Sequence, residues 1–503
     1  MNEGQIVVLT CRSSCQRHSN LSFRLMPFAR FDRYVDRHAR PFTERLQTLC
    51  RMPSVAARGT GMRAMAEAIE QLLQRTGAGT RVFKMGHGGY PIIYGECGSG
   101  ERCFIVYGHY DVASVGQLTD WSAGPFAANI EDGKLYARGA ANSKGNLIAR
   151  LAAVEAYQKT FGKLPVCLRF IIEGEEGIGS PSLYHFTQEH ADLLYAEGCI
   201  WDEGAKDTRE RPVISLGFKG IAFVELRVNG ARTDLHSKWG AIVPNPAWRL
   251  VQALATITSP KGVITIDGFS SHIAPLAAED MEALKAIELD EAGLKKEFRI
   301  GHWVGGMKGQ RLIKEHIFGA TCTICGIRTG HTEAGPKTLL PGMAMARLDF
   351  RLVPDLTPEL VLKLLREHLN ARDFQDIEII ELGNAPVAKA SAQSSVARAA
   401  IESAEAVYNA PPLVYPLDPT SGPVGAVCGI TQPPVPVVSF GAGYAASNPH
   451  APNENIRIDD FLQSIKFFGR MIHHLGGAET DRQTKSVKTT SARTSAQSNK
   501  LAG

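Results

Sequence analysis

Short, uninterrupted apolar runs alternate with helical patterns in the first part of the chain. The runs CFIVY (103–107) and VCLRFII (166–172) have no polar side, which is typical of central strands covered on both faces. The segment between them, 145–160, is predicted as a helix, and residues 62–75 show helical periodicity that stops at Gly77. A strand, a helix and a strand in this order predict an α/β domain with a largely parallel sheet.

The pattern changes near residue 220. Alternating and apolar segments there predict four strands, and helical segments predict two helices. In chain order these are strand 223–230, helix 244–257, strands 321–330 and 343–354, helix 357–369 and strand 376–382. The order β-α-β-β-α-β is the ferredoxin-like α+β plan. A long segment after the first helix, 258–320, interrupts this plan, and we expect it to be irregular.

Beyond residue 385, a helix over 395–408 and the apolar run 435–440 are expected to rejoin the first sheet. The sequence therefore predicts a smaller α+β domain inserted into a larger one, whose mixed, mostly parallel sheet is covered by helices. The expected divisions are a flexible arm over 1–30, the larger domain over 31–218 and 385–476, the inserted domain over 219–384, and a disordered tail over 477–503.

Composition narrows the class of protein. The 503 residues suit two domains, and 44% apolar with 21% charged residues is ordinary for a globular chain. The net charge of +4 is spread thinly, so we expect no nucleic-acid partner. No stretch approaches the ~20 apolar residues of a membrane span, so we expect no membrane association. Glu3 precedes the short apolar run Ile6–Leu9, so we do not interpret it as a signal peptide. Residues 1–25 are a flexible arm or an artefact of an early start codon, since Met26 opens a more ordinary beginning.

The ten cysteines show no disulfide framework, which favours reduced thiols and a cytoplasmic protein. Cys322 and Cys325 form a CxxC pair. A thiol redox enzyme would place such a pair near the start of a helix, whereas these two lie in a predicted strand. We therefore interpret them as packed thiols.

Four polar clusters follow or flank the predicted apolar strands, where α/β sheets gather ligand sites. They are His109 with Asp111, the stretch 137–146, the acidic block 173–180 and the stretch 448–455. A histidine two residues before a carboxylate can bind a metal while the carboxylate holds its other ring nitrogen. Each cluster alone also has an ordinary structural interpretation as a surface loop, so their joint occurrence carries the argument.

These motifs together resemble the metallopeptidase superfamily of aminoacylases, carnosine dipeptidases, carboxypeptidase G and succinyl-diaminopimelate desuccinylase. The similarity spans about residues 35 to 475. It includes YGHYDV, WSAGPF with DGKLYARGA, the EGEE block, Trp201-Asp202, DLHS, FRLVP and HAPNEN. The resemblance implies a metal-dependent hydrolase of a carbon–nitrogen bond, with a catalytic domain and an inserted lid or dimerisation domain.

The resemblance also implies roles for individual residues. His109 and Asp202 match ligands of one metal, Asp111 would orient His109, and His450 belongs to the second metal position. A glutamate of the EGEE block would act as general base toward the attacking water and then as acid toward the leaving nitrogen.

Three further matches lie outside the metal site. His236 in DLHS matches a lid histidine that, in dimeric relatives, stabilises the reacting oxyanion of the partner subunit. Arg351 and the turn TSGP, with Ser421 and Gly422, match positions that bind a substrate carboxylate, for which the guanidinium fork is suited. The resemblance thus predicts a homodimer acting on a small carboxylate-bearing substrate.

The sequence departs from the family pattern at two metal positions. Asn142 stands where the family has an aspartate bridging two metals, and an amide is a neutral and poorer bridge. Counting back from Gly179-Ser180 puts the base at Glu176 and Gly177 at the second metal's glutamate position. A slip of one residue would make Glu175 the base and Glu176 the ligand. We favour the first register, which predicts about one Mn²⁺ or Zn²⁺ per chain, held by His109, Asp202 and either Asn142 or His450.

The altered metal site leaves three functions open. The first is hydrolytic deamination of an aromatic amine such as a nitroanthranilate, in which one metal would suffice. The second is hydrolysis of a dipeptide or an N-acyl amino acid. The third is a catalytically dead binding relative, which retention of Glu176 together with the metal-site histidines argues against.

Overall fold

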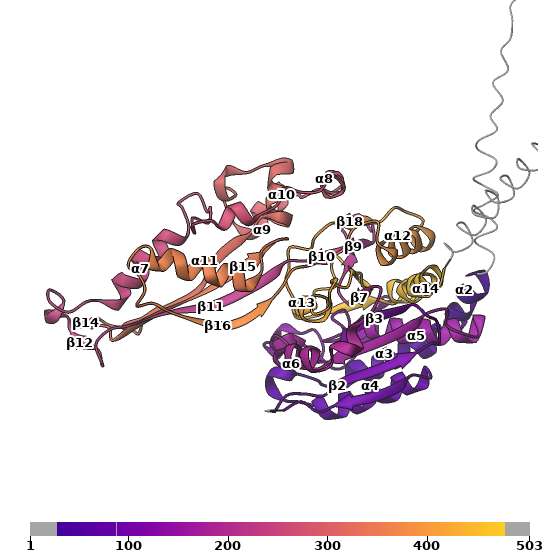
Figure 1. Cartoon of the computed structure of the whole chain (residues 1–503). Helices are drawn as coiled ribbons and strands as arrows, with labels where there is room; N and C mark the ends of the chain where they lie inside the picture. Colours follow the sequence, from indigo (N-terminus) through magenta and orange to yellow (C-terminus); the bar gives the residue numbers. More distant parts are fainter. Residues whose placement is uncertain (1–27, 87, 478–503) are drawn as a thin grey trace, which may run out of the picture.

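The computed structural model describes residues 28–86 and 88–477. The N-terminal and C-terminal thirds of the chain form one body, and the middle of the chain forms an elongated second body that projects from it (Figure 1). The predicted tail from 478 onward and residues 1–27 of the predicted arm lie outside the described residues. Residues 28–30 of that arm begin a helix, so the arm was predicted three residues too long.

The first body is built on an eight-stranded mixed sheet with the strand order β1-β2-β6-β3-β7-β19-β9-β18. The strands around the centre, β6, β3, β7 and β19, run parallel. The sheet strands are β1 Gly79–Phe83, β2 Ile92–Cys97, β3 Cys103–His109, β6 Cys167–Glu173, β7 Cys199–Trp201, β9 Val213–Ser215, β18 Leu413–Tyr415 and β19 Val437–Ser439.

Helices cover both faces of this sheet. Phe104 and Val106 of β3 join one apolar cluster, whereas Ile105 and Tyr107 join the cluster on the opposite face. Because alternate side chains of a strand point to opposite faces, an uninterrupted apolar run is buried on both. The first face packs against α2 Phe28–Arg37, α3 Ala39–Arg51, α4 Met62–Arg75, α5 Lys144–Phe161, α12 Ser395–Tyr408 and α14 Ile458–Leu475. The second packs against α6 Pro181–Glu189 and α13 Val424–Cys428.

The second body has an antiparallel sheet of order β13-β15-β11-β16, with two helices on one face. Its elements are β11 Gly220–Asn229, α7 Pro246–Ile257, β13 Thr321–Thr329, β15 Met343–Leu352, α11 Pro358–Asn370 and β16 Glu378–Ala385. The mixed α/β sheet with an inserted ferredoxin-like unit is therefore confirmed. Cys322 and Cys325 lie on β13, next to a register shift between Ile324 and Gly326.

The expectation that residues 258–320 are irregular is wrong. This segment contains three short helices, α8 Ala278–Lys285, α9 Glu291–Phe298 and α10 Gly309–Phe318. Helices of 8 to 10 residues have few turns in which to show periodicity, so their tertiary contacts stabilise them more than their own sequence does. α8 and α10 pack with Leu413 and Leu417 of the first body, which holds the segment against it.

Short pairs of strands complete the described structure. β10 Gly217–Phe218 pairs with β17 Ala388–Lys389 where the chain passes between the two bodies. The remaining strands are β4 Asn129–Glu131, β5 Lys134–Tyr136, β8 Ala205–Lys206, β12 Leu235–His236, β14 Leu339–Leu340, β20 Gly443–Tyr444 and β21 Asn455–Arg457. Within the described part of the chain, no helix combines the length and the hydropathy that crossing a membrane requires.

Candidate active site

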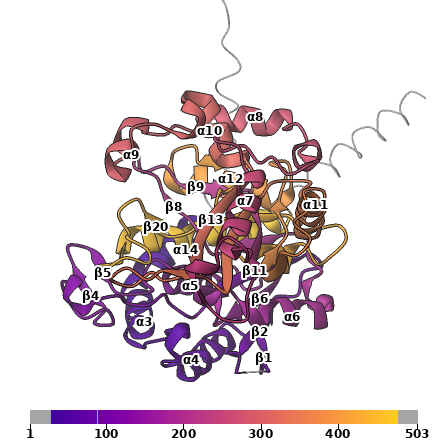
Figure 2. The same ribbon diagram turned by 90° about the vertical axis from the view of Figure 1, so that its left-hand side faces the viewer.

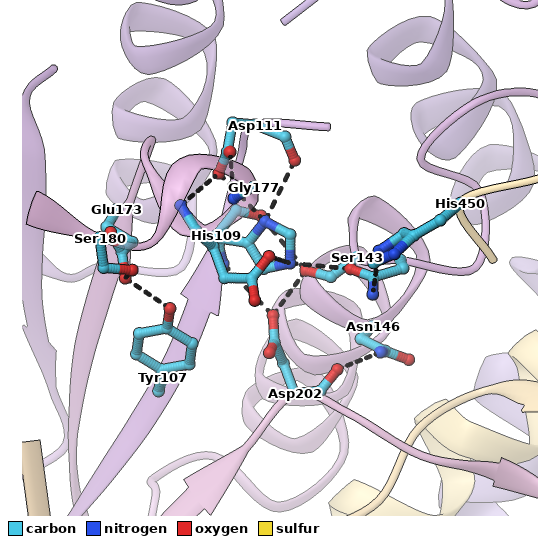
Figure 3. A network of polar contacts seen from close by, with 12 residues as sticks. Tyr107, His109, Asp111, Ser143, Asn146, Glu173, Gly177, Ser180, Asp202 and His450 are labelled. Atoms are coloured by element: carbon cyan, nitrogen blue, oxygen red, sulfur yellow. Dashed lines mark hydrogen bonds and ion pairs between the residues drawn. The ribbon is translucent and has the colours of Figure 1, made fainter. Parts of the chain in front are cut away.

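Polar side chains gather where three neighbouring parallel strands end. His109 is the last residue of β3, Glu173 is the last of β6, and Asp202 directly follows β7. Because the strands run parallel, their carboxyl ends meet at one edge of the sheet, and Figure 3 shows the side chains converging there. Asn142 lies just before α5, and His450 lies in the loop between β20 and β21.

His109 is buried, and its two ring nitrogens have different partners. Nδ1 lies 3.1 Å from Oδ1 of Asp111, and Nε2 lies 2.9 Å from Oδ1 of Asn142. Burial lowers the pKa of His109, but the hydrogen bond to Asp111 and the charges of Glu176, Asp202 and Asp111 raise it more, so the net pKa is well above the usual value. Asp111 therefore holds the ring in place and favours the tautomer with hydrogen on Nδ1.

Asn142 connects the two histidines of the site. Its Oδ1 faces His109, and its Nδ2 lies 3.1 Å from Nε2 of His450. Beside it, Oδ2 of Asp202 accepts hydrogen bonds from the Ser143 hydroxyl at 2.5 Å and from the His109 amide at 3.2 Å. These contacts link all four residues that the sequence suggested as metal ligands. Figure 3 labels three of them, His109, Asp202 and His450.

The donor groups differ between the two metal positions of the family pattern. Without a metal, Nε2–H of His109 can donate to the amide oxygen of Asn142, 2.9 Å away. A cation that replaced this hydrogen could bind Nε2 of His109 and the amide oxygen of Asn142 beside Asp202. The second position lacks a matching set, because Gly177 has no side chain and the Asn142 NH₂ group faces His450. The described residues contain no group of three or more His, Cys, Asp or Glu side chains placed to hold a metal.

Glu175 and Glu176 point in different directions. The buried carboxylate of Glu175 accepts backbone hydrogen bonds from Tyr90 and Ser182, both at 2.8 Å. Glu176 instead lines a cavity, and its Oε2 lies 3.9 Å from Nε2 of His109. This geometry supports the register in which Glu176 faces the substrate.

Two buried glutamates stabilise the loops of the site, and the sequence analysis identified neither of them. Glu173 accepts hydrogen bonds from Tyr107 at 2.6 Å and Ser180 at 2.7 Å. Burial has the largest effect and raises its pKa, the two hydrogen bonds lower it, and the charges of Asp111 and Glu176 raise it, so that the net pKa is about 8. A neutral Glu173 at the end of β6 would hold the turn that carries Glu176 without adding charge.

Glu454 is the second missed residue. Its buried carboxylate pairs with Arg138 at 2.7 Å and accepts backbone hydrogen bonds from Gly139, Ala141 and Asn142 at 2.9 to 3.0 Å. It therefore fixes the loop that presents Asn142. The signal was available, because Glu454 lies in the HAPNEN motif and Arg138 lies in DGKLYARGA.

A cavity of about 370 Å³ opens above these residues, between the two bodies. Asn142, Glu176 and His450 line one side, and Ser421 and Gly422 line another. Arg351, on β15 of the second body, also lines it, with its guanidinium 2.9 Å from Asp349. The structure thus brings the three suggested carboxylate-binding residues to the cavity that holds Glu176.

His236 is not part of this cavity. It lies on β12, which pairs with β14 at the left-hand end of the second body in Figure 1, remote from the sheet of the first. Figure 2 shows the molecule turned so that this side faces the viewer. Its ring accepts a hydrogen bond from the Lys238 amide at 3.1 Å, and the side chain is exposed. Within one chain, this histidine therefore cannot act at the proposed site.

Comparison with known proteins identifies the relatives of the chain. The model of peptidase family M20/M25/M40 matches residues 105–474. Human Beta-Ala-His dipeptidase is 30% identical over 359 residues, covering 67% of this chain and 70% of that protein. The Cys-Gly metallodipeptidase of Schizosaccharomyces pombe is 26% identical over 475 residues, covering 88% and 97%. The M20 family metallo-carboxypeptidase Sso-CP2 of Sulfolobus solfataricus superposes with a TM-score of 0.80 at 33% identity, covering 86% and 98%.

Proposed function

The chain belongs to peptidase family M20/M25/M40 and is a hydrolase of C–N bonds, and from that premise we propose that it is a metal-dependent dipeptidase. The relatives favour this alternative over the deamination of an aromatic amine, which was our first interpretation of the sequence, because those named above cut peptide bonds. The observation that carries the proposal is that Glu176 and Arg351 line one cavity. That arrangement suits a peptide bond next to a free carboxylate, and it also argues against a dead binding relative.

The residues of the cavity would have separate roles in the reaction. Arg351, Ser421 and Gly422 would bind the substrate carboxylate, which positions the scissile bond beside Glu176. Glu176 would take a proton from the attacking water and deliver it to the leaving nitrogen. Asp111 would keep His109 oriented through the contact to Nδ1.

The metal is proposed as one Mn²⁺ or Zn²⁺ per chain. His109, Asn142 and Asp202 would hold it, and His450 would lie next to it without a complete second set of ligands. When bound, a divalent cation lowers the pKa of water and polarises a carbonyl. Mixed nitrogen and oxygen donors, with no thiolate among them, suit either ion.

A substrate screen tests the proposed function. Purified protein loaded with Mn²⁺ or Zn²⁺ is expected to release amino acids from dipeptides, and to release no ammonia from aminobenzoates or nitroanthranilates. Product release would be followed by mass spectrometry. Turnover of the aromatic amines without turnover of dipeptides would contradict the proposal and restore the aminohydrolase interpretation.

We also propose a homodimer formed by the second body. Strand β13 is an edge of the antiparallel sheet, and Ile324 and Ile327 on it are 47% and 52% exposed. Helix α7, which packs on the same sheet, exposes Trp248 by 66%. An open edge beside exposed apolar side chains favours pairing with another copy. A second copy would also bring in a His236 that the chain's own cavity lacks.

Mixing two inactive variants tests this assembly. His236→Ala and Glu176→Gln are each expected to be inactive dimers, because one lacks the partner's histidine and the other lacks the base. After subunit exchange, about half of the dimers are mixed and each holds one complete site, so about a quarter of wild-type activity should return. Sedimentation checks the dimer.

Two outcomes would contradict the dimer proposal. One is a wild-type protein that sediments as a monomer with full activity. The other is no recovery of activity in a mixture whose subunit exchange has been demonstrated with labelled chains.

A cytoplasmic location is also our proposal. It is supported by the eight cysteines of the described residues, all of which are free thiols.

A further inference from the structure

A second cavity of about 400 Å³ adjoins the proposed catalytic cavity. Asn142, Glu203 and the Pro419-Thr420 turn line both cavities, so the two are continuous at these residues. Tyr415 forms part of the far wall, together with His316, which α10 of the inserted segment contributes. The proposed scissile position therefore has space on the side away from Arg351.

The wall that carries His316 is anchored. Lys219, between the two bodies, donates hydrogen bonds to the carbonyl oxygens of His316 at 2.9 Å and of Gly319 at 2.7 Å. Burial and the nearby Lys219 lower the pKa of His316, so its ring is neutral near pH 7. The other basic residue of the cavity lining, Lys206, is engaged by Asp460 and by Gln463. Neither residue presents a free positive charge to the cavity.

The carboxylates of the second cavity differ in their partners. Asp202 is held by Ser143, and Asp418 accepts hydrogen bonds from Ser215 at 3.0 Å and from Thr420 at 2.6 Å. Glu203 has its backbone fixed on both sides by the Ser439 hydroxyl, while its side chain is exposed to the cavity. Desolvation by the surrounding protein and the charges of nearby carboxylates, Asp418 first, raise the pKa of Glu203 to about 8. Among the contacts of the described residues, the Glu203 carboxylate has no hydrogen-bond or ion-pair partner. It is therefore the acidic group at the junction that is free to bind a substrate.

The two connected cavities are lined by different charged groups. Arg351 lines only the catalytic cavity, Asp202 and Asp418 line only the second cavity, and Glu203 lies where the two meet. An ammonium group at this junction would lower the pKa of Glu203 and favour its carboxylate form. We propose that Glu203 binds the free ammonium group of the substrate and that the second cavity holds its amino-terminal residue. This inference rests on the proposed peptidase activity. It selects zwitterionic dipeptides over N-acyl amino acids, because an acylated nitrogen has no charge to pair with Glu203.

The volume of the second cavity predicts the size of the amino-terminal residue that it can hold. About 400 Å³ lies in the range of a small-molecule site, larger than a glycyl or β-alanyl group fills. Large amino-terminal side chains should therefore be accepted between Tyr415 and His316.

Ala-Ala and N-acetyl-Ala-Ala test the proposal, because they share one scissile bond and differ in the charge of one nitrogen. We expect kcat/KM to be at least ~100-fold lower for the acetylated substrate, the scale of a lost charge-assisted contact. Glu203→Gln should remove most of this difference by raising KM for Ala-Ala, and leave N-acetyl-Ala-Ala kinetics nearly unchanged. Asp418→Asn is the matched control, because its carboxylate is already satisfied within the protein, and it should retain the difference.

A binding measurement separates this inference from the proposed function. The ketomethylene isostere of Ala-Ala, in which CH₂ replaces the peptide NH, and its N-acetyl derivative would be titrated calorimetrically into protein with and without metal. Tighter binding of the free amine, reduced by Glu203→Gln, supports the inference even if no dipeptide is cut. Equal binding of the two isosteres, or discrimination unchanged in Glu203→Gln, would overturn it even if dipeptides are good substrates.

Discussion

Replacing Glu176 by glutamine is expected to lower kcat by at least ~10²-fold, the usual scale of general acid–base catalysis. Glutamine keeps the size and polarity of the side chain but cannot accept the proton of the attacking water. Because Glu176 is not among the proposed metal ligands, the metal content should stay nearly unchanged. Steady-state kinetics and elemental analysis of the same preparation would measure both quantities.

Glu175→Gln is the matched control for this prediction. The Glu175 carboxylate is occupied by the backbone amides of Tyr90 and Ser182, so its replacement should lower thermal stability more than kcat. The opposite result, in which Glu175→Gln abolishes turnover and Glu176→Gln empties the metal site, would place the base at Glu175. The glutamate ligand would then be present, and the argument for a single metal would rest on Asn142 alone.

Removal of the divalent metal is expected to abolish activity, and readdition of about one equivalent per chain should restore it. The physical reason is that the proposed cation would lower the pKa of the attacking water and polarise the carbonyl at neutral pH. Elemental analysis during titration of the chelated protein would count the ions. Full activity after thorough chelation would contradict the whole mechanism, and two ions per active chain would contradict the single site.

A variant designed to bind a second ion tests the number of metal ions per chain. Asn142→Asp combined with Gly177→Glu restores both acidic side chains that the family pattern has and this chain lacks, so a second ion is expected to bind. A side chain at position 177 would begin 3.1 Å from the Asp111 carboxylate, so the loop must shift by a few tenths of an ångström. Asn142→Asp alone is the control, and it should leave the count near one.

The local pattern of the sequence determined most of the fold. Strands β3 and β6 are apolar throughout because both of their faces are buried, and this can be recognised without knowing which helices cover them. The motifs likewise showed that polar residues follow these strands. This could be recognised because the end of a strand and the residues after it are neighbours in the sequence. The three helices of residues 258–320 escaped prediction, since each is short and depends on partners such as Leu413 that are distant in the chain.

The tertiary structure alone decided which side chains meet. Arg351 reaches the cavity of Glu176 from the other body, and Glu454 holds the loop of Asn142 from more than 300 positions away in the chain. The tertiary structure also determines which residues lie far apart. Within one chain, His236 is remote from the cavity that holds Glu176. Local periodicity depends on neighbours a few residues apart, whereas the direction of a side chain and its partners depend on how whole elements pack. The sequence could therefore suggest the catalytic groups, but only the packed chain separated Glu175 from Glu176 and left Glu203 free.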